Sequence, residues 1–216
     1  MSLSFDLFWS FRSPYSYLLL PRIVDLVAMH DVACNVRIVY PIAVRQAEFF
    51  QKVDPLWAFY LMKDTYRTAE FLGMPYRWPN PDPVVMDPAT RLYPAEQPYI
   101  HRLSMLGIAA TEAGRGLPFI REVSHTIWSG TVENWHEGDH LAQAANRAGL
   151  DLVALDAAIA ADPDHHRAAI EANQEAQRAA GHYGVPLMAL DGEPFFGQDR
   201  FDQLVWRLKQ KGLKAR

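Results

Sequence analysis

Two serines near the start of the chain have the types and spacing to do chemistry. Ser13 and Ser16 flank Pro14-Tyr15 directly after the apolar run at 5–9, which predicts a short buried strand turning into a helix at the Ser-Pro pair. The first turn of a helix has unpaired N–H groups and a partial positive charge, which stabilise an anion such as a thiolate. A hydroxyl cannot form a disulfide, so dithiol chemistry is excluded at this turn, and any thiol there must come from a ligand.

Both serines also have purely structural interpretations. A serine followed by proline at the first helical position is a common helix N-cap, so Ser13 could serve only to begin the helix. Ser16, one turn further on, could pack or bond within the helix. The downstream motifs described below favour the chemical interpretation of Ser13.

The elements around the turn predict how it is positioned. A strand at 5–10 leads into an apolar helix at 13–30, and a strand at 35–40 completes a parallel βαβ unit. Pro21 lies inside the helix and predicts a kink about one turn earlier. The single cysteine, Cys34, is expected just ahead of the second strand and away from the serine turn, as a small packed residue.

The middle of the chain is predicted to be helical. Strand patterns disappear from about 43 to 181, and the proline-rich stretch at 74–83 is the clearest interruption. The expected helices cover 58–72, 97–113, 119–129, 139–148 and 152–181, the last of them broken at Asp162-Pro163.

Strand patterns return after Gly181. Residues 187–190 and 193–196 flank Asp191-Gly192, a two-residue hairpin turn, and an amphipathic helix follows at 201–211. The order βαβ, helical insertion, ββα predicts an α/β, thioredoxin-like fold with a large all-helical insertion. The expected domains are a discontinuous thioredoxin-like domain, 1–42 and 181–216, and an inserted helical domain, 43–180. Val185-Pro186 stands where such folds place a cis-proline.

Composition and charge limit the functions that the chain can have. The chain has 216 residues, 50% of them hydrophobic, and a net charge of −4, which gives no reason to expect a nucleic-acid partner. No apolar run approaches the ~20 residues of a membrane span, and the start of the chain lacks the pattern of a signal peptide. We therefore expect a cytoplasmic protein that binds no membrane. His136 and His140 have a spacing that can chelate a metal, but no third ligand is evident, so no metal is expected.

Three separated motifs carry a family resemblance. They are Phe-Arg-Ser-Pro-Tyr-Ser-Tyr-Leu at 11–18, Gly-His-Tyr-Gly-Val-Pro at 181–186 and Phe-Phe-Gly-Gln-Asp-Arg at 195–200, with weaker matches at 128–130 and 148–151. On these motifs the chain resembles the kappa-class glutathione transferase and 2-hydroxychromene-2-carboxylate isomerase family, relatives of the disulfide oxidoreductase DsbA. The resemblance covers nearly the whole length.

The resemblance implies glutathione as cofactor. Ser13 would be the catalytic residue, its hydroxyl donating a hydrogen bond to the glutathione sulfur. Since the sequence places no histidine base beside it, Ser13 would stabilise a thiolate and not act as a covalent nucleophile. The Val185 backbone would pair with the cysteinyl part of glutathione, Asp199 would take the γ-glutamyl ammonium, and the backbone or side chain of Gln198 would hold the adjacent carboxylate. Asp199 could also be only a helix cap. The expected cofactor-binding residues are Ser13, Val185, Phe196, Gly197, Gln198 and Asp199.

The expected activity is glutathione-dependent cis/trans isomerisation of an aromatic conjugated carboxylate, by reversible thiolate addition, in a homodimer. Isomerase relatives have a Gly/Asn-containing loop after the second strand that touches ligand; this chain departs from that pattern at 43–51, which leaves the substrate open. Arg45, Lys52 and Lys63 are interpreted as solvated helix charges. A kappa-type glutathione transferase or peroxidase, and a redox-inactive DsbA-like binding module, remain the alternatives.

Overall fold

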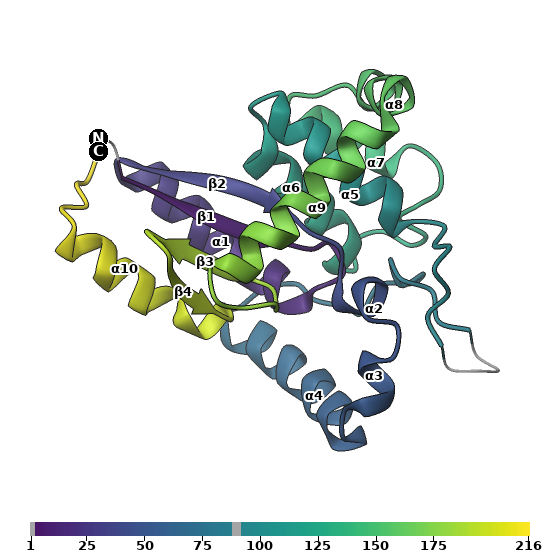
Figure 1. Ribbon diagram of the computed structural model, residues 1–216, viewed down its shortest axis with the longest axis horizontal. Helices are drawn as coiled ribbons and strands as arrows, with labels where there is room; N and C mark the ends of the chain where they lie inside the picture. Colours follow the sequence, from purple (N-terminus) through teal and green to yellow (C-terminus); the bar gives the residue numbers. More distant parts are fainter. Residues whose placement is uncertain (1–2, 88–91) are drawn as a thin grey trace.

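A mixed four-stranded sheet forms the centre of the thioredoxin-like part of the molecule. The structure is a computed structural model that describes residues 3–87 and 92–216 (Figure 1). The strand order is β2-β1-β3-β4. β1 (Leu3–Trp9) pairs parallel with β2 (Val32–Ile38) and antiparallel with β3 (Leu187–Leu190), which pairs antiparallel with β4 (Glu193–Phe196). The predicted α/β class and the predicted element order, βαβ followed by helices and then ββα, are confirmed.

Helices make up most of the rest of the described chain. Between β1 and β2 runs α1 (Pro14–Met29), and after β4 come a short 3-10 helix, η1 (Gln198–Arg200), and α10 (Phe201–Gln210). The helices between β2 and β3 are α2 (Ile42–Arg45), α3 (Phe49–Lys52), α4 (Pro55–Phe71), α5 (Ile100–Glu112), α6 (Gly116–Trp128), α7 (His140–Arg147), α8 (Leu152–Ala161) and α9 (Pro163–Ala179).

Buried side chains on β1 explain why helices cover both faces of the sheet. Successive strand side chains point to opposite faces. Leu7 and Trp9 belong to the large core cluster that includes α1, whereas Phe8 packs with Ala176 and Ala180 at the end of α9. Figure 1 shows α1 and α9 on opposite sides of the sheet. The sequence matches this burial at 7–9, where Leu-Phe-Trp is an uninterrupted apolar run.

The sequence predicted most elements to within a few residues, and the exceptions have physical causes. Cys34 was expected ahead of the second strand, which is wrong: β2 begins at Val32, and Cys34 pairs with Phe5 of β1. The short helices α2 and α3 were not predicted, because four residues hold too little periodicity to recognise. Asp191 and Gly192 both have positive φ, 50° and 83°, as the predicted hairpin turn requires.

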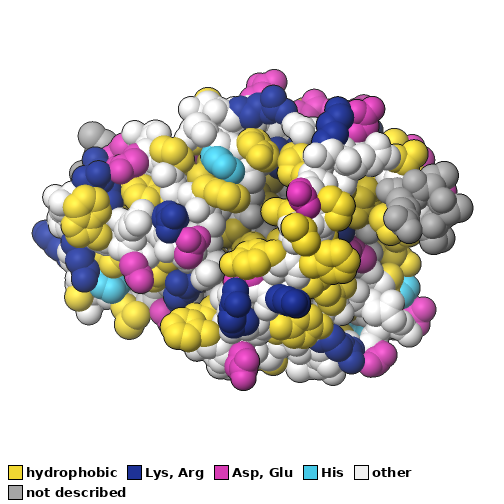
Figure 2. Space-filling view, turned by 90° about the horizontal axis from the view of Figure 1, so that it is seen from below, with side chains coloured by type: hydrophobic (Ala, Val, Ile, Leu, Met, Phe, Trp, Pro, Cys, Tyr) yellow, Lys and Arg dark blue, Asp and Glu magenta, His cyan; other side chains and the backbone are white. Residues whose placement is uncertain are grey.

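α4 presents an apolar face to solvent. Its exposed large side chains include Leu56, Phe59, Tyr60 and Phe71, and only Thr65 and Ala69 are buried. In Figure 2, which views the molecule from the side where α4 lies, hydrophobic side chains gather with lysines and arginines among them. Within the described ranges, no helix combines the length and apolar character needed to span a membrane.

Candidate active site

Ser13 caps α1 and also contacts the loop before β3. Its Oγ accepts a hydrogen bond from the Ser16 N–H at 3.2 Å, which is the N-cap interaction. The same hydroxyl donates to the Val185 carbonyl at 3.3 Å, across 172 residues of sequence. Ser13 therefore begins the helix, as its structural interpretation predicts, and it also contacts Val185, a second predicted site residue. Its chemical role stays a prediction.

The turn that carries Ser13 is fixed by buried contacts. The Ser13 N–H donates to the Ser10 carbonyl at 3.1 Å, closing the turn after β1. The Trp128 indole N–H on α6 donates to the Phe11 carbonyl at 2.8 Å, and both side chains are fully buried. A hydrogen bond made without water competition holds the turn in one position, so Ser13 stands on a rigid base.

The other members of the motif have different surroundings. Ser16 is completely buried, and its hydroxyl has no hydrogen-bond partner among the residues that the structure describes. Tyr15 is partly buried and donates to Asp64 on α4 at 2.6 Å, while Asp64 also pairs with Arg67. Burial first, and then the Asp64 carboxylate, raise the pKa of Tyr15. Of the two serines, only Ser13 is accessible.

The loop that carries Val185 is held by polar side chains from two helices. The buried Gln177 on α9 donates to the Gly184 carbonyl at 2.7 Å. Arg45 on α2 donates to the Tyr183 carbonyl at 2.7 Å and to the Gln177 side chain at 3.1 Å. The Val185–Pro186 peptide bond is cis, as predicted. In the part of the chain that is described, nothing accepts a hydrogen bond from the Val185 N–H.

The interpretation of Arg45 as a solvated helix charge is wrong. Arg45 is half-buried, and its buried Nε has no partner among the described residues. Burial, and then repulsion from Arg178, lower the pKa of Arg45 to about 10. A lone cation on a short helix gave no sequence signal for this role, because the carbonyl that it binds lies 138 residues away.

Next to this loop, the Gly197 turn brings the C-terminal motif into the site. The Gly197 N–H donates to the Pro186 carbonyl at 3.0 Å. Gly197 has φ of 97°, and a Cβ there would lie 2.6 Å from Oδ1 of Asp199, so a larger residue would displace that carboxylate. Asp199 is exposed and pairs with Arg200 at 2.8 Å. Among the described residues no hydrogen bond or ion pair joins Asp199 to Ser13, although both lie at the same end of the sheet.

Phe196 and Gln198 flank Gly197 on either side. The half-exposed Phe196 ring stacks on His182, with centroids 3.8 Å apart. Gln198 is bound by Arg22 of α1, whose Nη2 donates to the Gln198 carbonyl at 2.9 Å and to its side-chain Oε1 at 2.5 Å. Sequence reasoning missed Arg22, although a lone cation within an otherwise apolar helix was the available signal.

Two hydrogen bonds thus connect the predicted site residues: Ser13 binds the Val185 carbonyl, and Gly197, next to Gln198, binds the carbonyl of Pro186. We call this connected set the hydrogen-bonded path. The site contains no protein thiol, since Cys34 lies toward the opposite end of β1, in register with Phe5. Burial raises the pKa of Cys34 as well, which disfavours its thiolate. Among the described residues, no group of three His, Cys, Asp or Glu side chains could hold a metal ion.

Aromatic side chains gather beside the serine turn. Arg12 forms a two-pronged ion pair with Asp82, both bonds 3.1 Å long, and its guanidinium lies 5.4 Å from the centre of the Phe50 ring and 5.5 Å from that of Tyr93. Further ring contacts extend this group, which we call the aromatic cluster: Phe49, Phe50, Trp57, Tyr93 and Tyr183. It links α3 and α4 to the loop that carries Val185.

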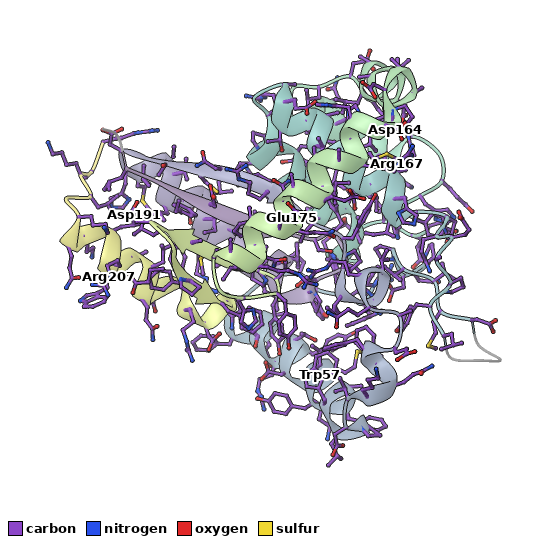
Figure 3. All side chains as sticks on the ribbon, viewed as in Figure 1. Trp57, Asp164, Arg167, Glu175, Asp191 and Arg207 are labelled. Atoms are coloured by element: carbon purple, nitrogen blue, oxygen red, sulfur yellow. The ribbon has the colours of Figure 1, made fainter. Side chains whose placement is uncertain are left out.

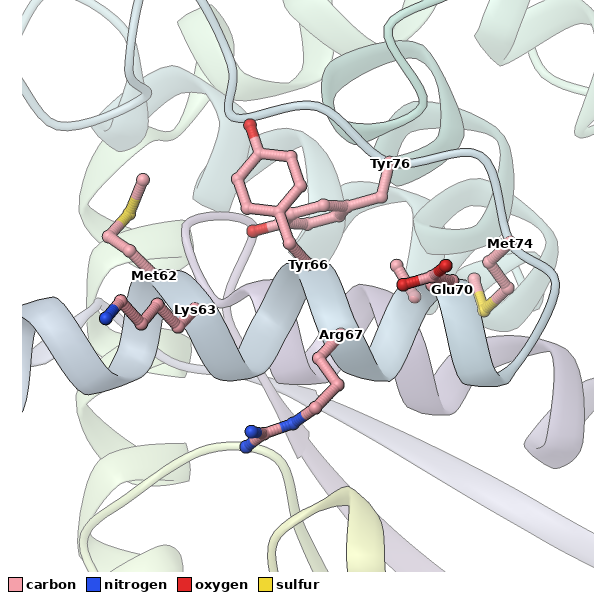
Figure 4. Close-up of a pocket in the computed structure, with 8 residues that line it drawn as sticks. Met62, Lys63, Tyr66, Arg67, Glu70, Met74 and Tyr76 are labelled. Atoms are coloured by element: carbon pink, nitrogen blue, oxygen red, sulfur yellow. The ribbon is translucent and has the colours of Figure 1, made fainter.

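Two cavities of several hundred Å³ lie outside this path. One of about 680 Å³ lies along α4 and is lined by Tyr66 and Tyr76 (Figure 4). Another of about 640 Å³ lies between α1, α6 and α7. Neither is lined by any of the predicted site residues. The candidate site is therefore defined by its hydrogen bonds and not by the size of a cavity.

Solved structures share this fold at low sequence identity. The match to a 2-hydroxychromene-2-carboxylate isomerase has a TM-score of 0.71 at 18% identity and covers 96% of this chain and 95% of that chain. A probable DsbA oxidoreductase from Streptomyces coelicolor gives 0.66 at 17%, covering 96% and 89%. Cytosolic disulfide reductase DsbM from Pseudomonas aeruginosa gives 0.63 at 15%, and a structure of it with GSH gives 0.58 at 15%; both matches cover 96% and 100%.

These identities show a common fold and leave the activity open. No curated protein sequence matches the chain. The family model of the DSBA-like thioredoxin domain matches residues 5–209. Because that match spans nearly the whole chain, and the sheet and the helices inserted between β2 and β3 agree with it, the chain belongs to the family of DSBA-like thioredoxin domains.

Proposed function

We propose that the protein is a glutathione-dependent isomerase of the 2-hydroxychromene-2-carboxylate isomerase type. It would interconvert the cis and trans forms of an aromatic conjugated carboxylate by reversible thiolate addition. One observation carries the proposal: an accessible serine hydroxyl begins α1 and bonds the Val185 carbonyl, at the position where a thiol ligand would meet the helix N-terminus. The absence of a protein thiol on this hydrogen-bonded path argues against disulfide chemistry here.

The residues present suit the chemical groups of glutathione. Ser13 supplies a hydroxyl for the sulfur, and the Tyr15 N–H has no partner among the described residues. The Val185 N–H is likewise available to a peptide-like ligand that adds to the loop as a strand would. At the amino-acid end, the exposed Asp199 carboxylate suits an ammonium and the Gln198 amide suits a carboxylate.

The chain's own contribution to the reaction is positioning and electrostatics. When bound, glutathione supplies a thiolate that can add reversibly to a conjugated double bond and so permit rotation about it. Ser13 turns its proton from the Val185 carbonyl to the bound sulfur, and the N–H groups of the first turn of α1 lower the pKa of that thiol. The aromatic cluster beside Arg12 offers flat apolar surfaces to an aromatic substrate.

Calorimetric titration of glutathione tests the cofactor site. Wild type is expected to bind, and Asp199→Ala is expected to bind about tenfold more weakly, because an exposed ammonium loses its charged partner. The matched control is Asp164→Ala on α9, which removes an exposed aspartate that also pairs with an arginine, Arg167, far from the site (Figure 3). An absence of binding at millimolar glutathione, or equal losses in both variants, would refute the proposed site.

Product analysis then separates the isomerase from its alternatives. An isomerase releases a rearranged substrate and unchanged glutathione, so glutathione is needed only in catalytic amount. A kappa-type transferase consumes the thiol and releases a conjugate. Binding without turnover across a panel of conjugated aromatic acids would favour a DsbA-like binding module instead.

A further inference from the structure

Arg22 is the one basic residue of α1, a helix that is otherwise mostly apolar. Its neighbours Leu18, Leu19 and Ile23 are fully buried, and Arg22 itself is half-buried. The guanidinium does not reach out to solvent. It binds Gln198 by two hydrogen bonds, of 2.9 and 2.5 Å, and lies 5.2 Å from the centre of the Phe201 ring.

The chemistry of these two side chains fixes the orientation of the Gln198 amide. A guanidinium has only donors, so the amide must present its oxygen to Arg22. Its two N–H groups are thereby turned away from Arg22. Without Arg22 the amide could rotate and present either its oxygen or its nitrogen to a ligand, and an oxygen would repel a carboxylate.

The charge on Arg22 also bears on the Gly197–Asp199 turn. Burial lowers the pKa of Arg22, and the carboxylates of Asp202 and Asp199 act in the opposite sense. An arginine stays protonated under all ordinary conditions, so a permanent cation lies against the Gln198 carbonyl. A charged donor makes stronger hydrogen bonds than a neutral one, so the charge of Arg22 strengthens its hold on Gln198.

We infer that Arg22 is a positioning residue for the ligand's amino-acid end, acting through Gln198. This inference rests on the proposed function, in which that end is the γ-glutamyl group of glutathione. Arg22 holds the Gln198 amide with its N–H groups free for the γ-glutamyl carboxylate, while Asp199 takes the ammonium. It does not touch the ligand itself.

The test compares two arginines by calorimetric titration of glutathione. Arg22→Met is expected to weaken binding about tenfold, the effect of losing one well-placed hydrogen bond to a charged group. The control is Arg207→Met on α10 (Figure 3), which removes an arginine that donates two hydrogen bonds to Glu193 and lies over the Trp206 ring, and that makes no hydrogen bond with Gln198. The control is expected to bind like wild type.

A double-mutant cycle separates positioning from a general structural effect. If Arg22 acts through Gln198, the variant Arg22→Met/Gln198→Ala binds no more weakly than Gln198→Ala alone. Arg22→Lys keeps the charge and a donor, so it is expected to bind glutathione more tightly than Arg22→Met and less tightly than wild type. If Arg22→Met does not fold, Arg22→Lys replaces it in the comparison with Arg207→Met. Fully additive losses would overturn the inference.

The outcomes also distinguish this inference from the function on which it rests. If wild type binds glutathione and Arg22→Met binds equally well, only the role of Arg22 is refuted. If folded wild type binds no glutathione at all, the proposed function fails, and the role of Arg22 fails with it.

Discussion

Replacing Ser13 with alanine separates its structural role from its chemical one. The change removes a hydroxyl that accepts from the Ser16 N–H and donates to the Val185 carbonyl. Nothing else in the turn needs to move, since the Trp128 bond to the Phe11 carbonyl remains. The variant is therefore expected to fold.

The structural role and the chemical role of Ser13 predict losses of different size on its replacement. Loss of an N-cap costs about 1 kcal/mol of unfolding free energy. The Val185 carbonyl is partly exposed, so water replaces most of the second bond. A hydrogen bond to a charged sulfur contributes about 1.5–3 kcal/mol, and its loss raises the pKa of a bound thiol by about one to two pH units. Activity is expected to fall by about 10²-fold or more, as on loss of one donor to a developing anion.

The assay follows the ultraviolet absorbance of the thiolate of bound glutathione as a function of pH, with thermal unfolding measured in parallel. Ser16→Ala is the matched control, because it removes the buried, unpartnered hydroxyl of the same motif. Ser16→Ala should leave both the pKa of the bound thiol and the stability nearly unchanged. An unchanged thiol pKa in Ser13→Ala, at full occupancy, would refute the role of Ser13 as a thiolate stabiliser.

Three further predictions address the ligand thiol, the Gly197 turn and pH. Cys34→Ala should keep glutathione-dependent activity within about twofold, because Cys34 lies about 13 Å along the sheet from the end of β1; a large loss would implicate a protein thiol. Gly197→Ala should weaken glutathione binding about tenfold or more, since its Cβ would displace Asp199, and calorimetry measures it. Burial lowers the pKa of His182, whose Nδ1 faces the Gly184 N–H at 2.8 Å. The unfolded chain therefore binds more protons, and stability should be full above about pH 6.5 and fall on acidification. His182→Asn, which keeps an acceptor, should flatten that slope in denaturant titrations at pH 5 to 7.

The sequence predicted the elements that local patterns control. The βαβ unit, the β3–β4 hairpin and the breaks at prolines all follow from the identity of neighbouring residues, and the structure has them. The start of β2 was misplaced because Ala33 is an apolar residue at an exposed position, so Val-Ala-Cys at 32–34 does not alternate in the sequence as it does in the structure. What draws Cys34 into the strand is its pairing with Phe5, a contact between distant parts of the chain.

The candidate site was likewise predictable where a short sequence motif defines it, and not where side chains bind backbone carbonyls. The motif around Ser13 and the Val185-Pro186 pair were recognisable, and the structure joins them by one hydrogen bond. Arg22 and Arg45 were not assigned to the site, because each acts on a carbonyl group more than 100 residues away in the sequence. Gln177 was not assigned either, although the Gly184 carbonyl that it binds is only seven residues away. A carbonyl has no sequence signature, so its partner can be found only from the fold.

Side chains of the helical segment between β2 and β3 help to hold the candidate site in position. The Val185 loop precedes β3, yet the side chains that hold its carbonyls come from α2 and α9. Gln177 is fully buried, so an alternative position of the loop would leave its amide N–H without the Gly184 acceptor, at a cost of about 1–3 kcal/mol. The Arg12 ion pair with Asp82 ties the serine turn to the same segment. Residues of this segment can therefore change the geometry of the site without touching a ligand, and substrate preference can vary while the Ser13 turn stays the same.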